Sequence, residues 1–384
     1  RPDIGCVQAR LAPDNDDSWL ARMFTVEYAA NFEVVLPALA ECGADVSLLT
    51  NVRYELDALP RAFGVERCFD GRMRYPRVAS RLLGRLASLA PDVVHVQSMI
   101  SSRFDALLWP LVRRRRPLVV TAHNVRSHEN VPWEHWTWWR VLRAADGIVV
   151  HTRESADVVA RRRGGSARIA VIHHGDYAFF ERDGGGDREQ ARRRLGLRPD
   201  GRLVLSFGAI RPYKGIVELI GALPAVRARH PDVQLVIAGP LLVGSVAEYE
   251  QAIRRAGVSE VVTLRPAYVP HAEVALYFRA ADVAVYNYRE VTDSGSLRVA
   301  CSLGTPVVAA AVGAFSEFLT DGVNARLVPP GDGAALAAAI GDVLADPAAA
   351  ARMAAAAREL AAVRWSWTDS AKATLELYRA VARG

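Results

Sequence analysis

Lysine is nearly absent from this chain of 384 residues, although its formal net charge is +6 and its pI is near 9.3. The only lysines are Lys214 and Lys372, so arginine carries almost all of the positive charge. No helix-turn-helix, zinc-finger or RNA-stacking motif accompanies this charge, and we predict that nucleic acid is not a partner. The arginine runs 113–116 and 161–163 fit either solvated helix ends or contact with phosphates or an anionic membrane surface.

Cysteine is also scarce: Cys6, Cys42, Cys68 and Cys301 lie far apart and form no C-x-x-C pair. This spacing predicts neither a disulfide framework nor a zinc site and favours buried thiols in a reducing compartment. The first residues show no charged n-region followed by an apolar h-region, and no apolar run reaches the roughly 18 residues that span a bilayer. We therefore expect a cytoplasmic protein, with peripheral contact at the inner membrane face as an alternative.

Short runs rich in valine and isoleucine recur along the chain, and an amphipathic stretch follows each of them. This alternation is typical of parallel sheets covered by helices, and the length suits two α/β domains. We expect strands at residues 4–9, 45–50, 92–97, 118–123, 147–151 and 169–173, and again at 203–207, 233–238, 261–264, 283–286, 306–310 and 325–328. The segment 181–187 combines glycine with charge and lacks apolar periodicity, which predicts a domain boundary there.

The two halves share a local similarity, because Arg143–Val150 resembles Arg279–Tyr286 and each predicts a helix end, an acidic turn and a strand. Similar segments at matching places support twin Rossmann-like domains. We predict an α/β fold with two Rossmann-like domains facing across a cleft, over residues 1–180 and 181–365, and a C-terminal helix over 366–384 that returns to the first domain. Ligands of such sheets bind beyond the carboxyl ends of the strands, which suits group transfer between two bound molecules.

The strongest local motif is the loop after the predicted strand 203–207, which contains Gly208, Arg211 and Lys214 before a helix begins. A diphosphate needs paired cations, and glycine lets the backbone approach it closely. Because lysine is so scarce, Lys214 in this loop favours phosphate binding over a solvated surface turn. We predict that these three residues bind a diphosphate.

A second motif follows the predicted strand 283–286, where a polar loop leads to Ser294, Gly295 and Ser296 at the start of an apolar helix. The N–H groups at a helix start carry partial positive charge, so we predict that these residues hold phosphates. An ordinary helix cap is the alternative interpretation.

These two motifs, followed by Gly304-Thr-Pro-Val-Val308, resemble the C-terminal domain of the GT-B glycosyltransferases of family 4. The other matching pieces are Tyr268-Val-Pro270, Tyr277–Asp282, Tyr288-Arg-Glu290 and, in the first half, Thr121–Val125, His128-Glu129 and His173-His-Gly175. The resemblance implies the GT-B fold and a retaining bacterial enzyme, most naturally a hexosyltransferase. It also implies that the matching Arg211 and Lys214 bind the phosphates of a nucleotide-sugar donor.

The chain departs from this family at two positions. Many members carry two glutamates separated by seven residues before G-T-P-V-V, and this chain has Val291 and Val299 there. Glu290 lies one position from the first glutamate and is our candidate replacement, and nothing replaces the second. We therefore predict that Glu317 accepts the ribose hydroxyls.

His123 ends the predicted strand 118–123 and so lies at the carboxyl edge of the first sheet. The resemblance implies a histidine close to the transferred sugar, where a neutral imidazole favours an oxocarbenium-like transition state. A histidine buried for packing is the alternative. We predict that Asn124, His128, Glu129 and His174 complete the sugar and acceptor pocket.

The stretch Trp133–Trp139 fits either an aromatic platform for a sugar or lipid acceptor, or a helix whose aromatic side packs on the core. Asp14-Asn-Asp-Asp17 resembles a metal-binding D-x-D motif but follows the first strand, so we predict no metal site. We also expect no cofactor, because the nucleotide sugar is a co-substrate.

The sequence thus predicts a retaining, metal-independent glycosyltransferase that moves a sugar from a nucleoside diphosphate to a small-molecule, glycan or lipid-linked acceptor. Three alternatives are a nucleotide-sugar epimerase, a phosphorylase on the same fold, and a nucleotide-sugar-binding subunit without catalysis.

Overall fold

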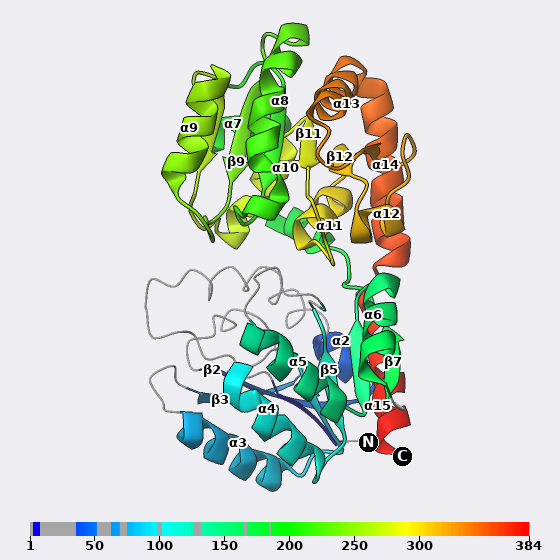
Figure 1. The fold of residues 1–384 in the computed structure, drawn as a ribbon. Helices are drawn as coiled ribbons and strands as arrows, with labels where there is room; N and C mark the ends of the chain where they lie inside the picture. Colours follow the sequence, from blue (N-terminus) through cyan, green and yellow to red (C-terminus); the bar gives the residue numbers. More distant parts are fainter. Residues whose placement is uncertain are drawn as a thin grey trace. The chain divides into compact units, whose positions relative to one another are not determined.

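The computed structural model describes residues 3–7, 36–51, 63–69, 75–97, 102–123, 125, 132–164, 167–183 and 186–383. The chain divides into two compact units (Figure 1): unit 1 comprises residues 1–175 and 366–384, and unit 2 comprises residues 176–365. The division follows Gly175, whereas the sequence analysis places it after residue 180. The last helix of the chain, α15 (Trp367–Ala382), belongs to unit 1.

Unit 1 is built on a parallel sheet with the strand order β3-β2-β1-β4-β5-β6-β7. Besides α15, its elements are β1 (Asp3–Val7), α2 (Leu36–Glu41), β2 (Asp45–Asn51), β3 (Gly64–Phe69), α3 (Tyr75–Leu89), β4 (Val93–Val96), α4 (Ser102–Arg113), β5 (Leu118–Thr121), α5 (Pro132–Ala144), β6 (Gly147–Val150), α6 (Arg153–Arg163) and β7 (Arg168–Val171). The strand order reverses between β1 and β4, as in a Rossmann fold.

Apolar clusters cover both faces of this sheet, because alternate residues of a strand point to opposite faces. Leu118 and Val120 of β5 pack with helices α3 to α6, whereas Val119 packs with α2 and α15. The buried residues that α15 adds to the second cluster are Ala371, Leu375, Leu377, Tyr378 and Val381. Since full burial of a leucine or valine stabilises a fold by about 1.5–3 kcal/mol, α15 is an integral part of the core of unit 1.

Unit 2 contains a second parallel sheet with the order β10-β9-β8-β11-β12-β13, which reverses between β8 and β11. Its elements are η3 (Ala178–Asp183), α7 (Arg188–Arg194), β8 (Leu203–Phe207), η4 (Pro212–Lys214), α8 (Ile216–Arg229), β9 (Gln234–Ala238), α9 (Val246–Ala256), β10 (Val262–Arg265), α10 (His271–Ala280), β11 (Val283–Tyr286), α11 (Gly295–Ser302), β12 (Val307–Ala310), α12 (Gly313–Phe318), β13 (Arg326–Val328), α13 (Gly333–Ala345) and α14 (Pro347–Arg364). Both units therefore have the Rossmann-like α/β architecture that the sequence predicts.

An aspartate has the same structural role in both units. In unit 1 Asp146 exchanges two hydrogen bonds with Leu118, donating its N–H to the carbonyl and accepting the Leu118 N–H on Oδ2, both at 2.8 Å. In unit 2 Asp282 makes the same pair of bonds with Leu203, at 2.9 and 2.7 Å. Each aspartate joins a helix end to the next strand and ties it to the start of a neighbouring strand. The sequence similarity of the two halves therefore reflects the same local structure.

Strand β3 is not predicted by the sequence analysis. It lies at the edge of the sheet and carries Glu66, whose carboxylate pairs with Arg85 of α3. Continuous apolar runs mark strands that are buried on both faces, and an edge strand does not need one.

Among the described residues, no single helix is both long and apolar enough to cross a bilayer. Gly333–Ala345 and Pro347–Ala382 meet the criteria of length and composition only together, and the chain bends by 101° between them. Leu336, Ile340 and Val343 of the first segment are buried in the core of unit 2.

Candidate functional site

Three of the residues predicted to bind the diphosphate, Gly208, Lys214 and Ser296, converge in unit 2 where β8 and β11 end. Gly208 follows β8 in a left-handed backbone conformation, with φ at 103°. A Cβ atom on Gly208 would lie 3.2 Å from Nζ of Lys214 and 3.6 Å from Cβ of Ser296. The loop after β8, the turn η4 and the start of α11 therefore meet at one point. This point is the switch in strand order, where open parallel sheets bind their ligands.

The turn η4 holds Lys214 against the loop that follows β11. Gly215 ends the turn in a left-handed conformation, with φ at 63°, and a Cβ atom there would lie 2.0 Å from the carbonyl oxygen of Asn287. Only glycine fits this close contact. Lys214 Nζ lies 5.0 Å from the ring centroid of Tyr288, a cation–π distance, and Arg211 is half-buried directly before the turn.

The serine side chains at the start of α11 form hydrogen bonds with backbone groups of unit 2. Ser294 Oγ caps the helix by accepting from the Leu297 N–H at 3.3 Å, and Ser296 Oγ donates to the Phe207 carbonyl at 2.9 Å. The Ser294 N–H donates to Oδ1 of Asp293 at 2.8 Å. The groups at the start of α11 that remain candidates for phosphate binding are therefore the backbone N–H groups of Gly295 and Ser296. These groups lie in the first turn and have no hydrogen-bond partner within the helix.

A buried ion pair supports this helix start from the interior of unit 2. The Arg298 side chain is 1% exposed, and its guanidinium lies 3.1 Å from Oδ1 of Asp293. Its Cζ lies 4.5 Å from the ring centroid of Trp365 and 5.2 Å from that of Phe318. Because a buried charge is costly without a partner, this pair fixes the turn that leads into α11.

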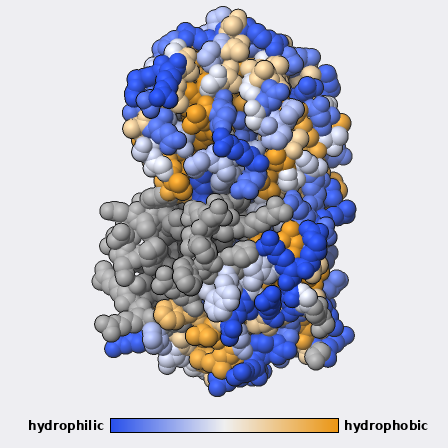
Figure 2. Space-filling model, viewed as in Figure 1, coloured by the Kyte–Doolittle hydropathy of each residue, from blue (hydrophilic) through white to orange (hydrophobic). Residues whose placement is uncertain are grey.

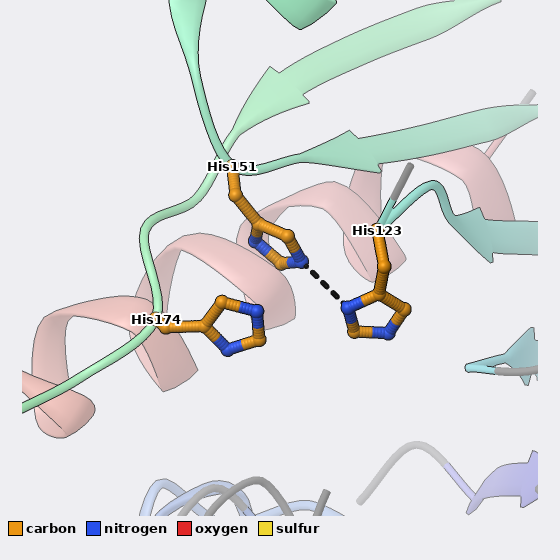
Figure 3. Close-up of side chains that lie close together, drawn as sticks. All are labelled: His123, His151 and His174. Carbon is orange, nitrogen blue, oxygen red and sulfur yellow. Dashed lines mark hydrogen bonds between the residues drawn. The ribbon is translucent and has the colours of Figure 1, made fainter. Parts of the chain in front are cut away.

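Three histidines follow three neighbouring strands of unit 1: His123 after β5, His151 directly after β6 and His174 after β7. Because these strands pair in parallel, their carboxyl ends lie at one edge of the sheet. Figure 3 shows the three rings directed toward one another from the three strand ends. Nε2 of His151 lies 3.1 Å from Nδ1 of His123, and the ring centroids of His151 and His174 are 3.8 Å apart.

Two of these histidines are predicted site residues, and the sequence analysis misses His151. The signal was present, since a histidine ends or directly follows each of three consecutive predicted strands, but only the parallel pairing of these strands shows that the three histidines meet. The predicted pocket residues Asn124, His128 and Glu129 lie outside the described residues, as does the Asp14–Asp17 motif.

The hydrogen bonds of this cluster define where the imidazole protons lie. Nδ1 of His151 donates to the Ile172 carbonyl at 2.8 Å, so a neutral His151 presents the lone pair of Nε2 to His123. Burial lowers the pKa of His123 well below 6.5, and the charge of His151 lowers it further. A neutral His123 then carries its proton on Nδ1 and has Nε2 as its acceptor nitrogen.

Comparison with known proteins places these two sites in a family. The family described as "Glycosyltransferase Family 4" matches residues 34–175, and "Glycosyl transferases group 1" matches residues 187–360. D-inositol 3-phosphate glycosyltransferase 1 of Catenulispora acidiphila is 31% identical over 414 residues, covering 97% of this chain and 93% of that protein. The chain belongs to glycosyltransferase family 4.

Another relative agrees with this assignment, and solved structures share the fold. D-inositol 3-phosphate glycosyltransferase of Mycobacterium marinum is 34% identical over 310 residues, which cover 75% of this chain and 63% of that protein, less than two thirds of its length. Sucrose-phosphate synthase from Thermosynechococcus elongatus has a TM-score of 0.77 at 21% identity and covers 99% of each chain. HepE of Anabaena, in complex with UDP and glucose, has a TM-score of 0.76 at 20% identity and covers 98% of this chain and 100% of that one. The predicted GT-B fold is thus confirmed.

Val291 and Val299 occupy the two positions at which the resemblance to family 4 implies glutamates. Val299 is 1% exposed in α11, so the helix offers no carboxylate at that position, and the Val291 carbonyl accepts from Ala314 at the start of α12 at 3.3 Å. Glu317, on α12, is half-buried, whereas Glu290 is exposed. Their predicted roles toward the donor stay predictions.

A cavity of about 590 Å³ among the described residues of unit 2 lies at the opposite edge of the sheet. It is lined by Arg202, Asp232 and Asp282, which precede β8, β9 and β11, and by residues of α13 and α14. Because ligands of these sheets bind at the carboxyl ends of the strands, we do not assign the donor to this cavity.

Exposed apolar side chains gather on unit 1 of this family 4 chain. Phe104, Leu107 and Leu111 of α4 are exposed, and Figure 2 shows hydrophobic surface over this helix. Each interpretation of the tryptophan-rich stretch fits one of its residues: Trp139 is buried and packs on the core, whereas Trp136 is exposed. The exposed arginines 114 and 115 follow α4 directly. Peripheral membrane contact stays a prediction.

Unit 1 also contains a buried histidine that should make its stability depend on pH. Nε2 of His95 forms a hydrogen bond with Oγ1 of Thr121, and Nδ1 forms one with the hydroxyl of Tyr378. Burial, and to a smaller extent the charge of His151, lowers the pKa of His95 from 6.5 to about 3. Between these pH values the unfolded chain binds a proton that folded His95 does not. We expect His95 to contribute a loss of roughly 1.4 kcal/mol of unfolding free energy for each pH unit below 6.5.

Urea unfolding of the parent and of His95→Gln at pH 7, 6 and 5 measures this contribution. The difference in stability between the two proteins should shrink as the pH falls. A difference that stays constant with pH would show that His95 does not titrate in this way.

Proposed function

We propose that this chain is a retaining glycosyltransferase that takes a sugar from a nucleoside diphosphate donor. The observation that carries the proposal is the convergence of Gly208, Lys214 and Ser296 at the switch point of the second sheet. A cation, a close-approach glycine and a helix start are three features that bind phosphate groups. HepE of Anabaena, with the same fold, is bound to UDP, which makes UDP the first nucleotide to test.

In the proposed reaction the leaving diphosphate is stabilised by this chain's own groups. Arg211, Lys214 and the N–H groups of Gly295 and Ser296 offset the negative charge that grows as the glycosidic bond breaks. The leaving oxygen takes the proton of the acceptor hydroxyl on the same face of the sugar, so the anomeric configuration is retained and no separate general base is needed.

His123 is the proposed residue at the transferred sugar. The bonds from the Ile172 carbonyl through His151 hold the His123 ring in one orientation with Nε2 as the acceptor nitrogen. In this role Nε2 of His123 accepts a hydrogen bond from a hydroxyl of the sugar and so raises the electron density on the sugar ring. Higher electron density there favours an oxocarbenium-like transition state. His151 is therefore a positioning residue for His123.

The variant His123→Ala tests this role. We expect kcat to fall by on the order of a hundredfold while the Kd for the nucleoside diphosphate changes little, because the lost interaction is strongest in the transition state. Steady-state kinetics and nucleotide titration give the two numbers. An unchanged kcat would assign His123 to packing alone.

Donor binding without metal is the direct test of the proposed function. In excess EDTA, UDP at a hundred times its Kd should raise the unfolding free energy by about 2.7 kcal/mol, measured by thermal shift against ADP and GDP. Transfer from a UDP-sugar should also persist in EDTA, because cationic side chains and helix amides offset the diphosphate charge. D-inositol 3-phosphate is the first acceptor to assay, because relatives carry that name. Activity that EDTA abolishes and Mg²⁺ restores would contradict the proposal.

A further inference from the structure

We propose that His123, His151 and His174 form a binding site for a divalent transition-metal ion of the zinc class. The three side chains come from three separate strand ends of unit 1, and their candidate ligand atoms all lie within 4.8 Å of one another. His151 and His174 are buried and His123 is half-buried. Figure 3 shows that the rings converge on one space and do not point apart.

The donor set selects the type of ion. Imidazole nitrogen suits Zn²⁺, Cu²⁺ and Ni²⁺, whereas Mg²⁺ and Ca²⁺ prefer oxygen. Three histidines with a fourth position for water is a common arrangement for zinc. The three histidines therefore suit a zinc-class ion and do not suit Mg²⁺.

The distances are close to those that zinc requires. With Zn–N bonds of about 2.0–2.1 Å, two nitrogens of a tetrahedral site are roughly 3.3 Å apart. Nε2 of His151 and Nδ1 of His123 are 3.1 Å apart, so this pair already has the spacing of two ligands. One candidate ligand atom from each of the three rings lies within 4.8 Å of the other two, so a small turn of the His174 ring toward the pair completes the site.

Neighbouring groups fix the His151 and His174 rings, as outer groups fix the ligating histidines of a metal site. Nδ1 of His151 donates to the Ile172 carbonyl at 2.8 Å, which is the outer bond that fixes a ligating histidine and directs its other nitrogen inward. His173 donates from Nδ1 to the His151 carbonyl at 2.8 Å and so ties the adjacent loop to this backbone. His174 also packs edge-on against Trp367, with ring centroids 6.5 Å apart.

Metal binding and sugar transfer compete for His123. A metal ion on its Nδ1 replaces the hydrogen bond from His123 to His151 and locks the ring in the metal site. We therefore expect zinc to inhibit transfer, a consequence that rests on the proposed function, whereas the binding of zinc does not.

The test uses the full chain, stripped with a chelator and dialysed. Zn²⁺ is titrated in competition with a chromophoric chelator, and Co²⁺ is added separately because a tetrahedral site gives it a strong visible absorption. We expect one tight ion per chain in the parent protein. His174→Ala and His151→Ala should each weaken zinc binding by about a hundredfold or more, since even an outer-shell change costs up to that factor.

The control variant is His271→Ala, at the start of α10 in unit 2, which should bind zinc like the parent. Circular dichroism confirms that each variant is folded, and only proteins with the site should gain thermal stability from zinc. Equal zinc affinity in the parent and in folded His174→Ala would overturn the proposal, as would the absence of tetrahedral Co²⁺ absorption.

A second arm separates this proposal from the proposed function. Saturating Zn²⁺ should slow transfer by at least about tenfold, and EDTA should restore it. Lys214→Ala should lose transfer yet bind zinc like the parent, because Lys214 lies in unit 2. A protein that binds zinc but shows no transfer under any condition would contradict only the proposed function. Zinc that binds at the three histidines without slowing transfer would contradict only the inhibitory role.

Discussion

Lys214→Ala should lower kcat/KM for sugar transfer by on the order of a hundredfold or more. Its ammonium lies beside Gly208 and Ser296, where the leaving diphosphate is proposed to bind, so its attraction grows as charge develops on that group. Lys214→Arg should recover only part of the activity, because a planar guanidinium does not replace a compact ammonium in a loop fitted to it. Steady-state kinetics over a range of donor concentrations separate the effects on kcat and KM.

Lys372→Ala is a matched control for this variant, since Lys372 is the only other lysine and its side chain is 62% exposed on α15. It should leave transfer unchanged. Thermal unfolding should be similar for all three variants, because Lys214 is not part of the apolar core. A folded Lys214→Ala enzyme with the parent's kcat/KM would show that the donor phosphates bind elsewhere.

Arg298→Ala should lower the unfolding free energy by about 3–5 kcal/mol, the largest effect on stability that we expect from one side chain in unit 2. Arg298 is among the largest fully buried side chains, and its removal leaves both a cavity beside Trp365 and an altered environment for Asp293. Arg298→Met keeps most of the volume but also leaves the Asp293 carboxylate without its partner, so it should recover only the part of the loss that comes from the cavity. Urea unfolding of the two variants measures the difference.

Arg289→Ala is the surface control, because Arg289 pairs with Glu218 but its side chain is 64% exposed. Exposed pairs of this kind contribute roughly 0–1 kcal/mol, so this variant should remain near the parent. If Arg298→Ala and Arg289→Ala unfold at similar urea concentrations, the buried pair does not stabilise unit 2 as we describe.

Much of the fold could be predicted from the sequence because many of the strands whose burial the structure describes are buried on both faces. Such strands need continuous apolar runs, and Leu203–Phe207 and Val283–Tyr286 are found at the predicted residues. Strand β3 could not be predicted in this way, because it lies at an edge and the adjacent charged residues Glu66 and Arg67 interrupt its apolar sequence. Sequence periodicity reports burial, and an edge strand is only partly buried.

The candidate site residues of unit 2 lie closer together in the sequence than those of unit 1. Gly208 and Lys214 are neighbours in the chain, and the scarcity of lysine made this loop conspicuous. The helix cap formed by Ser294 was the alternative interpretation of this segment, whereas the hydrogen bond from Ser296 Oγ to the Phe207 carbonyl could not be predicted, because the two residues are far apart in sequence. His151 was missed since its partners are far away in sequence, and parallel pairing of β5, β6 and β7 is what brings them together.

The membership of α15 in unit 1 has a consequence for the order in which the protein is made. The ribosome synthesises all of unit 2 before the residues of α15 exist, yet Leu375, Tyr378 and Val381 cover one face of the sheet of unit 1. Until then Val46, Val119 and their neighbours lack the part of their cover that α15 provides, whereas unit 2 is already complete in sequence. The synthesis of unit 1 therefore begins before that of unit 2 and ends after it. During translation the incompletely covered sheet of unit 1 is the part of the chain most in need of a chaperone.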